Sequence, residues 1–176
     1  MDETEKFLIA AETADLSTMR TLLAIHPNIH FFARNIWGHT AMHKAAKKDY
    51  DKVLRLLIRH GAFLDPIDQS GSTPLITASS QGATKCVRIL LEHGADHTIA
   101  LKSGVNALML AVYHSRLPSV KLLLSHGANV EATAQNGLNA LLYACFKGNE
   151  EAAEVLLDYG ADIDVSGPEG NTSLMW

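Results

Sequence analysis

The sequence predicts an all-α solenoid of stacked helix-turn-helix units with protruding finger loops, and three observations predict it: two glycine series and one recurring order of helix signals. The glycines recur at a 33-residue step, at Gly38, Gly71, Gly104, Gly137 and Gly170 and again at Gly61, Gly94, Gly127 and Gly160. A fixed period indicates one unit that is copied and stacked, so each unit buries its apolar face against its neighbours. Function is therefore expected along a surface rather than in a single pocket.

The single domain 1–176 is expected to open with a degenerate capping unit over residues 1–34. Ala10-Ala11 and Leu22-Leu23 stand where the later units carry apolar residues, with a connecting loop about two residues longer. The segment before them is polar, which suits the outward face of a terminal unit.

Full units are predicted at 35–67, 68–100, 101–133 and 134–166, and the second of these shows the order of signals. Thr73 is a good helix N-cap, and Pro74 follows at the first helical position, where its missing N–H costs nothing. Gly82 marks the break before a second helix with apolar residues at helical spacing, which Gly94 ends. The stretch Asp96–Ser103 lacks a helical stripe and predicts a projecting finger.

A partial unit is predicted over residues 167–176, where the chain stops inside the first helix of a sixth copy. Without its second helix this unit would leave apolar surface of the fifth unit uncovered. The array is therefore interpreted as truncated, which indicates an artificial boundary, a disordered remainder or a longer parent protein.

Two motifs carry a family resemblance, because they recur in phase over residues 35–166. They are Thr40-Ala41-Met42-His43 with His60-Gly61-Ala62, and Thr73-Pro74-Leu75 with His93-Gly94-Ala95-Asp96. These segments resemble the ankyrin repeat, with its period of 33 residues and its T-P-L-H-x-A signature.

Later units depart from that signature in two ways. Asn106 and Asn139 replace the Thr, and Ile76, Met109 and Leu142 replace the motif His. Because Asn also caps helices, the fold is expected to survive. The hydrogen-bond network that Thr and His provide between repeats in this family is expected to be weaker there.

Composition excludes several classes of function. A net charge of -4 argues against a general phosphate-neutralising surface, so nucleic acid is not expected as a partner. The acidic start is unlike a secretory signal, and no apolar run approaches the ~20 residues of a membrane span. Cys86 and Cys145 form no metal-binding or disulfide pattern. A cytoplasmic or nuclear location is the expectation.

No catalytic, cofactor or metal site is predicted. The periodic His60, His93 and His126 are interpreted as helix-terminal residues that suit the helix dipole, since equivalent atoms lie roughly 8–10 Å apart, too far to share a metal. No HExxH, GxSxG or phosphate-binding glycine loop occurs. Both cysteines are interpreted as small core residues.

The resemblance implies that partner contacts come from finger tips and from the concave side of the first helices. The finger positions are Ile36, Trp37, His39, Gln69, Ser70, Ser72, Lys102, Ser103, Val105, Gln135, Asn136 and Leu138. The matching helix positions are Lys47, Lys48, Ser80, Gln81, Tyr113, His114, Phe146 and Lys147.

Trp37, Tyr113 and Phe146 stand out in this set, because large aromatics at solvated positions are typical interface anchors. The alternative is packing: Trp37 under the first finger, and Phe146 over Tyr113. A methyl-lysine cage is disfavoured because Trp37 lies about two repeats, roughly 20 Å, from Tyr113. The lysines of the same face favour an acidic or phosphorylated peptide.

The leading hypothesis is a non-enzymatic module that binds a partner protein or extended peptide on its concave face. Preorganised helices order few side chains on binding, so modest contacts over several repeats can give useful affinity. The alternative is a substrate-recruiting arm of a larger enzyme, ligase complex or pathogen effector whose catalytic part lies outside this chain. A third possibility, a structural spacer, is disfavoured by Tyr113 and Phe146. The oligomeric state is left open.

Overall fold

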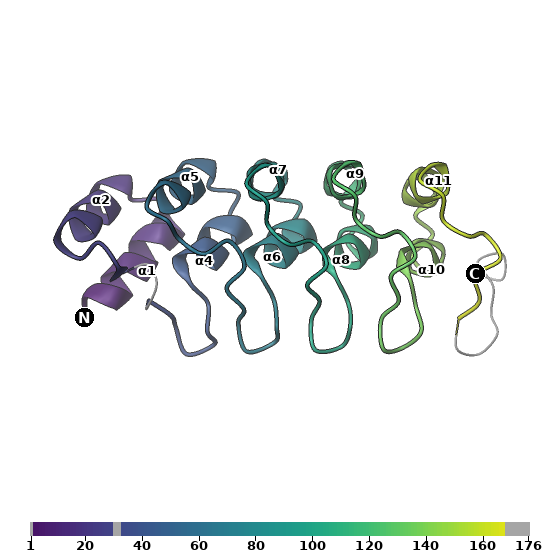
Figure 1. Ribbon diagram of the computed structural model, residues 1–176, viewed down its shortest axis with the longest axis horizontal. Coiled ribbons are helices and arrows are strands. Elements are labelled where there is room, and N and C mark those ends of the chain that lie inside the picture. Colours follow the sequence, from purple (N-terminus) through teal and green to yellow (C-terminus); the bar gives the residue numbers. More distant parts are fainter. Residues whose placement is uncertain (1, 30–32, 168–176) are drawn as a thin grey trace.

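The computed structural model describes residues 2–29 and 33–167, which form helix pairs laid side by side in two rows (Figure 1). The inner row holds α1 (Glu3–Thr13), α4 (Ala41–Lys47), α6 (Pro74–Gln81), α8 (Ala107–Tyr113) and α10 (Ala140–Phe146). The outer row holds α2 (Leu16–Ile25), α5 (Asp51–Arg59), α7 (Thr84–Glu92), α9 (Leu117–Ser125) and α11 (Glu150–Asp158). The predicted all-α solenoid is confirmed.

The first helix pair, α1 and α2, occupies the part of the chain predicted as the capping unit. Asp2 caps α1 by accepting a hydrogen bond from the N–H of Glu5, and Asp15 caps α2 in the same way from Thr18. Lys44 of α4 forms a 2.8 Å ion pair with Glu12 and so ties α1 to the next repeat. Of the predicted sixth unit, residues 168–176 lie outside the described residues.

The inner helices begin at the residues that the sequence predicts. The Oγ1 of Thr73 accepts a hydrogen bond from the N–H of Ile76 at 3.2 Å, and Pro74 occupies the first turn. Asn106 and Asn139 do the same for Met109 and Leu142, each at 3.0 Å. The Asn replacements therefore keep the cap, as expected.

Helix ends confirm the predicted glycine and histidine roles. Gly82 ends α6 in the left-handed region at φ 73°, and Gly94 follows the end of α7 at φ 85°. His60, His93 and His126 are the C-caps of α5, α7 and α9. The last two also place Nδ1 within 2.8 and 2.9 Å of the carbonyl four residues earlier.

The core is built from rows of equivalent residues. Leu57, Leu90, Leu123 and Leu156 of the outer helices are fully buried, as are Ala45, Ala78, Ala111 and Ala144 of the inner helices. Small Ala side chains let inner helices approach closely, while the leucines fill the space between the two rows. Cys86 is buried in this core and Cys145 packs against it, which agrees with their predicted role.

The finger loops project from the inner row in parallel (Figure 1). Each finger is hydrogen-bonded to the one before it through backbone groups: Gln69 N–H donates to the Trp37 carbonyl, Lys102 to Ser70, and Gln135 to Ser103, at 3.1, 3.2 and 2.9 Å. Isolated antiparallel bridges close the bases of the third and fourth fingers, Ala100 with Asn106 and Thr133 with Asn139. The fingers thus form one continuous backbone ladder.

Candidate binding surface

The predicted contact residues lie on the finger loops and at the ends of the inner helices, and we call this surface the finger band. Lys47, Ser80, Tyr113 and Phe146 occupy the same position of successive repeats, at the ends of α4, α6, α8 and α10. Because each repeat has the same fold, these side chains face the same side of the array as the fingers that precede their helices.

An open groove with a volume of about 630 Å³ lies at the N-terminal end of this band. Its lining consists of Trp37, His39, Lys47, Asp68, Gln69 and Ser70. The first two fingers and the end of α4 therefore enclose it. Five of its residues belong to the predicted contact set, and Asp68 is the one that sequence reasoning did not include.

Trp37 forms one wall of the groove, and hydrogen bonds to its backbone fix the position of the first finger. The Oδ1 of Asn35 accepts hydrogen bonds from the N–H groups of Trp37 and His39 at 3.0 and 2.9 Å. The Trp37 side chain itself is 58% exposed, with its ring centroid 6.3 Å from that of His39. The finger is thus fixed while the indole stays open to solvent, which argues against simple packing.

Asp68 forms the opposite wall and is tied to the second finger. Its Oδ1 accepts hydrogen bonds from the N–H groups of Ser70 and Ser72 at 2.8 and 2.9 Å, and its Oδ2 lies 3.2 Å from His39 Nε2. Partial burial raises the pKa of this carboxyl, but the hydrogen bonds from Ser70 and Ser72 together outweigh it and leave the pKa below its ordinary value. Asp68 therefore stays ionised and places a negative charge in the groove.

His43 lies directly behind the groove and links two repeats. Its ring stacks on His39 at 5.7 Å, its Nδ1 lies 3.2 Å from the backbone N of Thr40, and its Nε2 lies 3.0 Å from the Ser72 carbonyl. Burial lowers the pKa of His43, so the ring is neutral at pH 7. The Thr and His network expected from the family signature is therefore present between the first two full repeats.

An aromatic cluster forms the second notable part of the band, at the ends of α8 and α10. The Tyr113 ring meets His114 and Tyr143 edge-on, at centroid distances of 5.1 and 5.9 Å. Lys147 Nζ lies 4.6 Å from the Tyr113 centroid, within cation–π range. Phe146, which directly precedes Lys147 in the sequence, is 53% exposed.

Tyr143 is absent from the sequence-based set, although the structure brings it into contact with Tyr113. Its hydroxyl accepts a 3.1 Å hydrogen bond from the Asn136 amide, so it also links the fourth finger to α10. The available signal was its spacing, since Tyr143 lies one turn before Phe146 on the same helix.

Burial at His114, with Arg116 and Lys147 nearby, lowers the pKa of this imidazole. His114 therefore contributes a neutral ring at pH 7 rather than a positive charge. The positive charge of the cluster comes from Lys147.

The remaining predicted positions differ in the solvent exposure of their side chains. Ile36 is 77% exposed, and Lys48, Gln81, Lys102 and Gln135 are also exposed. Ser80 and Leu138 are half-buried. Ser72 is buried, because the finger turns inward there toward the start of α6, so its side chain adds little to the exposed surface.

The described residues offer little for nucleophilic or metal chemistry. Burial raises the pKa of both Cys86 and Cys145, which disfavours a thiolate. Within the described part of the chain, no three His, Cys, Asp or Glu side chains lie close enough to hold a metal ion.

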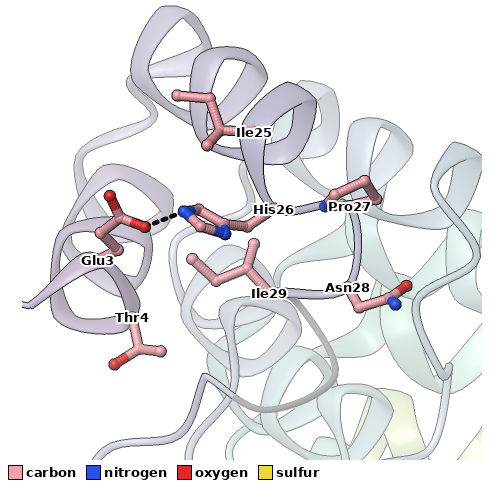
Figure 2. Close-up of a pocket in the computed structure, with 7 residues that line it drawn as sticks. All are labelled: Glu3, Thr4, Ile25, His26, Pro27, Asn28 and Ile29. Atoms are coloured by element: carbon pink, nitrogen blue, oxygen red, sulfur yellow. Dashed lines mark ion pairs between the residues drawn. The ribbon is translucent and has the colours of Figure 1, made fainter.

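A further cavity of about 400 Å³ belongs to the first helix pair alone (Figure 2). Glu3 and Thr4 at the start of α1 face His26 and Ile29 after α2, and an ion pair joins Glu3 to His26. None of its lining residues belongs to the predicted contact band, so it is separate from the groove.

Comparisons with known proteins agree with this architecture. The family model of ankyrin repeats in three copies matches residues 7–100 and 98–167. A search of curated proteins gives no match. Within the described residues, no helix has the length and apolar character needed to cross a membrane. Because the family model covers nearly the whole chain, this protein belongs to the ankyrin-repeat family, whose repeats are generally protein–protein interaction modules.

Proposed function

We propose that this protein is a non-enzymatic binding module that holds another protein, as an extended peptide or a domain, along the band of finger tips and inner-helix ends. The observation that carries the proposal is the 630 Å³ groove, in which an exposed Trp37 stands beside Lys47 and the second finger. Exposed aromatic side chains beside polar groups are typical anchors of protein interfaces.

Preorganisation supports this role. Backbone hydrogen bonds join each finger to the next, so a partner meets a surface whose main chain is already ordered. Binding then costs mainly the rotamer freedom of the exposed side chains. Contacts spread over several repeats can therefore add up to useful affinity.

Charge on the band favours an acidic partner. Lys47, Lys48, Lys102 and Lys147 line it, and Asp68 is the negative residue in the groove. A partner carboxylate or phosphate would meet these lysines near the aromatic anchors, which favours fast association as well as orientation.

The test is site-specific photocrosslinking from Lys47, followed by calorimetry with the purified partner that is captured. Trp37→Ala and the double change Tyr113→Ala with Phe146→Ala are each expected to weaken binding by at least ~2 kcal/mol, the scale of interface hot spots. Tyr159→Ala is the control, because Tyr159 is 48% exposed at the end of an outer helix.

Unchanged affinity in folded variants at both aromatic sites would contradict the proposed surface. Equal weakening by Tyr159→Ala would contradict it as well, since that residue lies outside the band.

A further inference from the structure

The outer helices carry a row of positive charge that the proposed binding surface does not use. Arg20, Arg55, Arg88 and Lys121 occupy corresponding positions of α2, α5, α7 and α9, and all four are exposed. Neighbouring helices pack roughly 8–10 Å apart, so these side chains form a regular line along the array. In a protein with a net charge of -4, this concentration of cations is a local feature.

Extra cations widen the row at its N-terminal end. On α5, Lys52 and Arg59 stand about one turn to either side of Arg55, so the three charges lie along one face of the helix. The opposite face of α5 is buried through Val53, Leu54 and Leu57. The cations therefore point away from the inner helices and from the finger band.

A shallow groove of about 170 Å³ opens within this basic region, between α2 and α5. Figure 1 shows these two helices next to each other at the N-terminal end of the outer row. Leu16 and Leu56 supply its apolar part, and the rest of its lining is Arg20, Lys52, Arg55 and Arg59. Such a groove has room for a side chain rather than for a whole helix.

No carboxylate lines the groove, and within residues 2–29 and 33–167 none of its four cations forms an ion pair. The acidic residues on or capping these outer helices are Asp15, which bonds Thr18, together with Asp51 and Glu92. The four cations outnumber the carboxylates of Asp15 and Asp51 on these two helices, and this excess raises the local positive potential, which attracts an anionic partner.

The row reverses sign at the last helix of the outer layer. The position after Lys121 is Glu154, and α11 also exposes Glu150, Glu151 and Asp158 without a basic residue. An anionic partner is repelled at that end and attracted most strongly around α5, which carries three exposed cations.

We propose that the outer face of α2 and α5 is a second interface, which binds an acidic helical segment of a partner protein. Glutamates spaced one turn apart on such a helix match the spacing of Lys52, Arg55 and Arg59. One apolar side chain of the same helix enters between Leu16 and Leu56. The spread of the cations along α5 favours a row of carboxylates over a single phosphate, and the arginines suit bidentate carboxylate contacts.

The probe is a synthetic helical peptide with Glu at one-turn spacing and a central Leu, compared with the same peptide carrying Gln for Glu. The full chain should bind the Glu peptide, and the amide NMR signals that shift should belong to α2 and α5. Arg20→Glu with Arg55→Glu should weaken binding at least about tenfold, which corresponds to 1.4 kcal/mol. Raising the salt concentration should also weaken it.

The matched control is Lys6→Glu with Lys121→Glu, which changes the net charge equally at exposed sites outside both the groove and the finger band. Equal weakening by this control would overturn the proposal, because it would show an effect of net charge alone. If the Glu double variant does not fold, Arg20→Gln with Arg55→Gln and the NMR map of the unchanged protein decide the question.

Further outcomes separate this interface from others. Failure of the Glu peptide to bind would overturn the proposal, as would equal binding of the Gln peptide. Binding of vesicles containing phosphatidylserine or of single-stranded RNA, without peptide binding, would overturn it in favour of another anion. Shifts confined to Lys102 and Tyr113 would assign the peptide to the finger band and overturn the second interface alone.

Discussion

The finger loops at the two ends of the array are held by different hydrogen bonds. In the first two fingers, the Oδ1 atoms of Asn35 and Asp68 each accept two backbone N–H groups. The corresponding residues of the third and fourth fingers are Leu101 and Ala134, which offer no side-chain oxygen. The backbone bond that closes all four fingers remains there, with Leu101 N–H donating to the Val105 carbonyl at 2.9 Å, and in the fourth finger the Oδ1 of Asn136 accepts the Leu138 N–H at 3.2 Å.

The helices that follow these fingers show the same change, from a polar residue in the first full repeat to apolar residues in the later ones. His43 bonds to the Ser72 carbonyl and so crosses from the first full repeat to the second. Met109 and Leu142 replace it further along and are fully buried. A buried histidine therefore joins the N-terminal repeats, whereas apolar side chains take its place in the C-terminal repeats, where Asn149 and Glu131 make side-chain hydrogen bonds between repeats. The two halves should respond differently to pH and to substitution.

The largest expected effect is in the third finger, where the backbone contact is closest. A Cβ on Gly104 would lie 2.9 Å from the Gln135 nitrogen, and its φ of +79° is unfavourable for an L side chain. Gly104→Ala should lower the free energy of unfolding by about 2–3 kcal/mol, measured by urea denaturation. Gly127→Ala is the control, because its φ is +84° but its Cβ would meet open space.

Gly127→Ala should cost only about 1 kcal/mol, the strain of a left-handed residue. Equal losses at the two glycines would show that the fourth finger moves aside easily. The third and fourth fingers would then be less tightly packed than the 2.9 Å contact at Gly104 indicates.

The next largest effect concerns the polar link of the N-terminal half. His43→Leu copies the residue found at Leu142, but it leaves the Ser72 carbonyl and the Thr40 N–H without the imidazole. Such unsatisfied buried groups should cost about 1–3 kcal/mol at neutral pH. A urea midpoint equal to that of the parent would show that these groups find other partners.

The pH dependence of stability should depend on the same histidine. The pKa of His43 is lower in the folded protein than its ordinary value of 6.5, so the unfolded chain binds the proton first as pH falls. Stability from the neutral ring is therefore complete above about pH 6.5 and declines below it. Unfolding at pH 7.5 and pH 5 should show a smaller difference in His43→Leu than in the parent.

Met109→Leu serves as the control for that experiment, because Met109 occupies the position of His43 two repeats further on and its side chain does not titrate. It should leave the difference between the two pH values close to that of the parent. An unchanged difference in His43→Leu would assign the pH dependence to other groups.

A smaller effect is expected from the caps of the C-terminal half. Asn139→Ala removes the oxygen that accepts the Leu142 N–H and should cost about 1 kcal/mol in the free energy of unfolding. Asn139→Thr, which restores the family residue, should recover most of that loss. Failure of Thr to recover it would show that the bond from the Asn139 amide to Glu131 matters more than the cap.

The smallest effect is expected in the aromatic cluster. Lys147→Met keeps the aliphatic stem and removes the charge over Tyr113, which should cost about 0.5 kcal/mol. A double-mutant cycle with Tyr113→Leu isolates this term in thermal or urea unfolding. A coupling energy of zero would mean that Lys147 is available to a partner rather than engaged with the ring.

The sequence by itself determined the repeat architecture of this protein. Period, helix caps and helix ends are local signals, since a cap such as Thr73 or Asn106 acts on an N–H three residues away. The cores of equivalent repeats follow from the same period, which places Leu57, Leu90 and Leu123 in one buried row. Such local and periodic information can be read without coordinates.

Only the tertiary structure decided which side chains meet across repeats. The groove between Trp37 and Asp68, the contact of Tyr113 with Tyr143, and the inward turn of Ser72 depend on how one finger lies against the next. The groove between α2 and α5 likewise depends on the packing of two helices from different repeats. These distances follow from the stacking of repeats and the side-chain rotamers, and no local sequence signal specifies either of them.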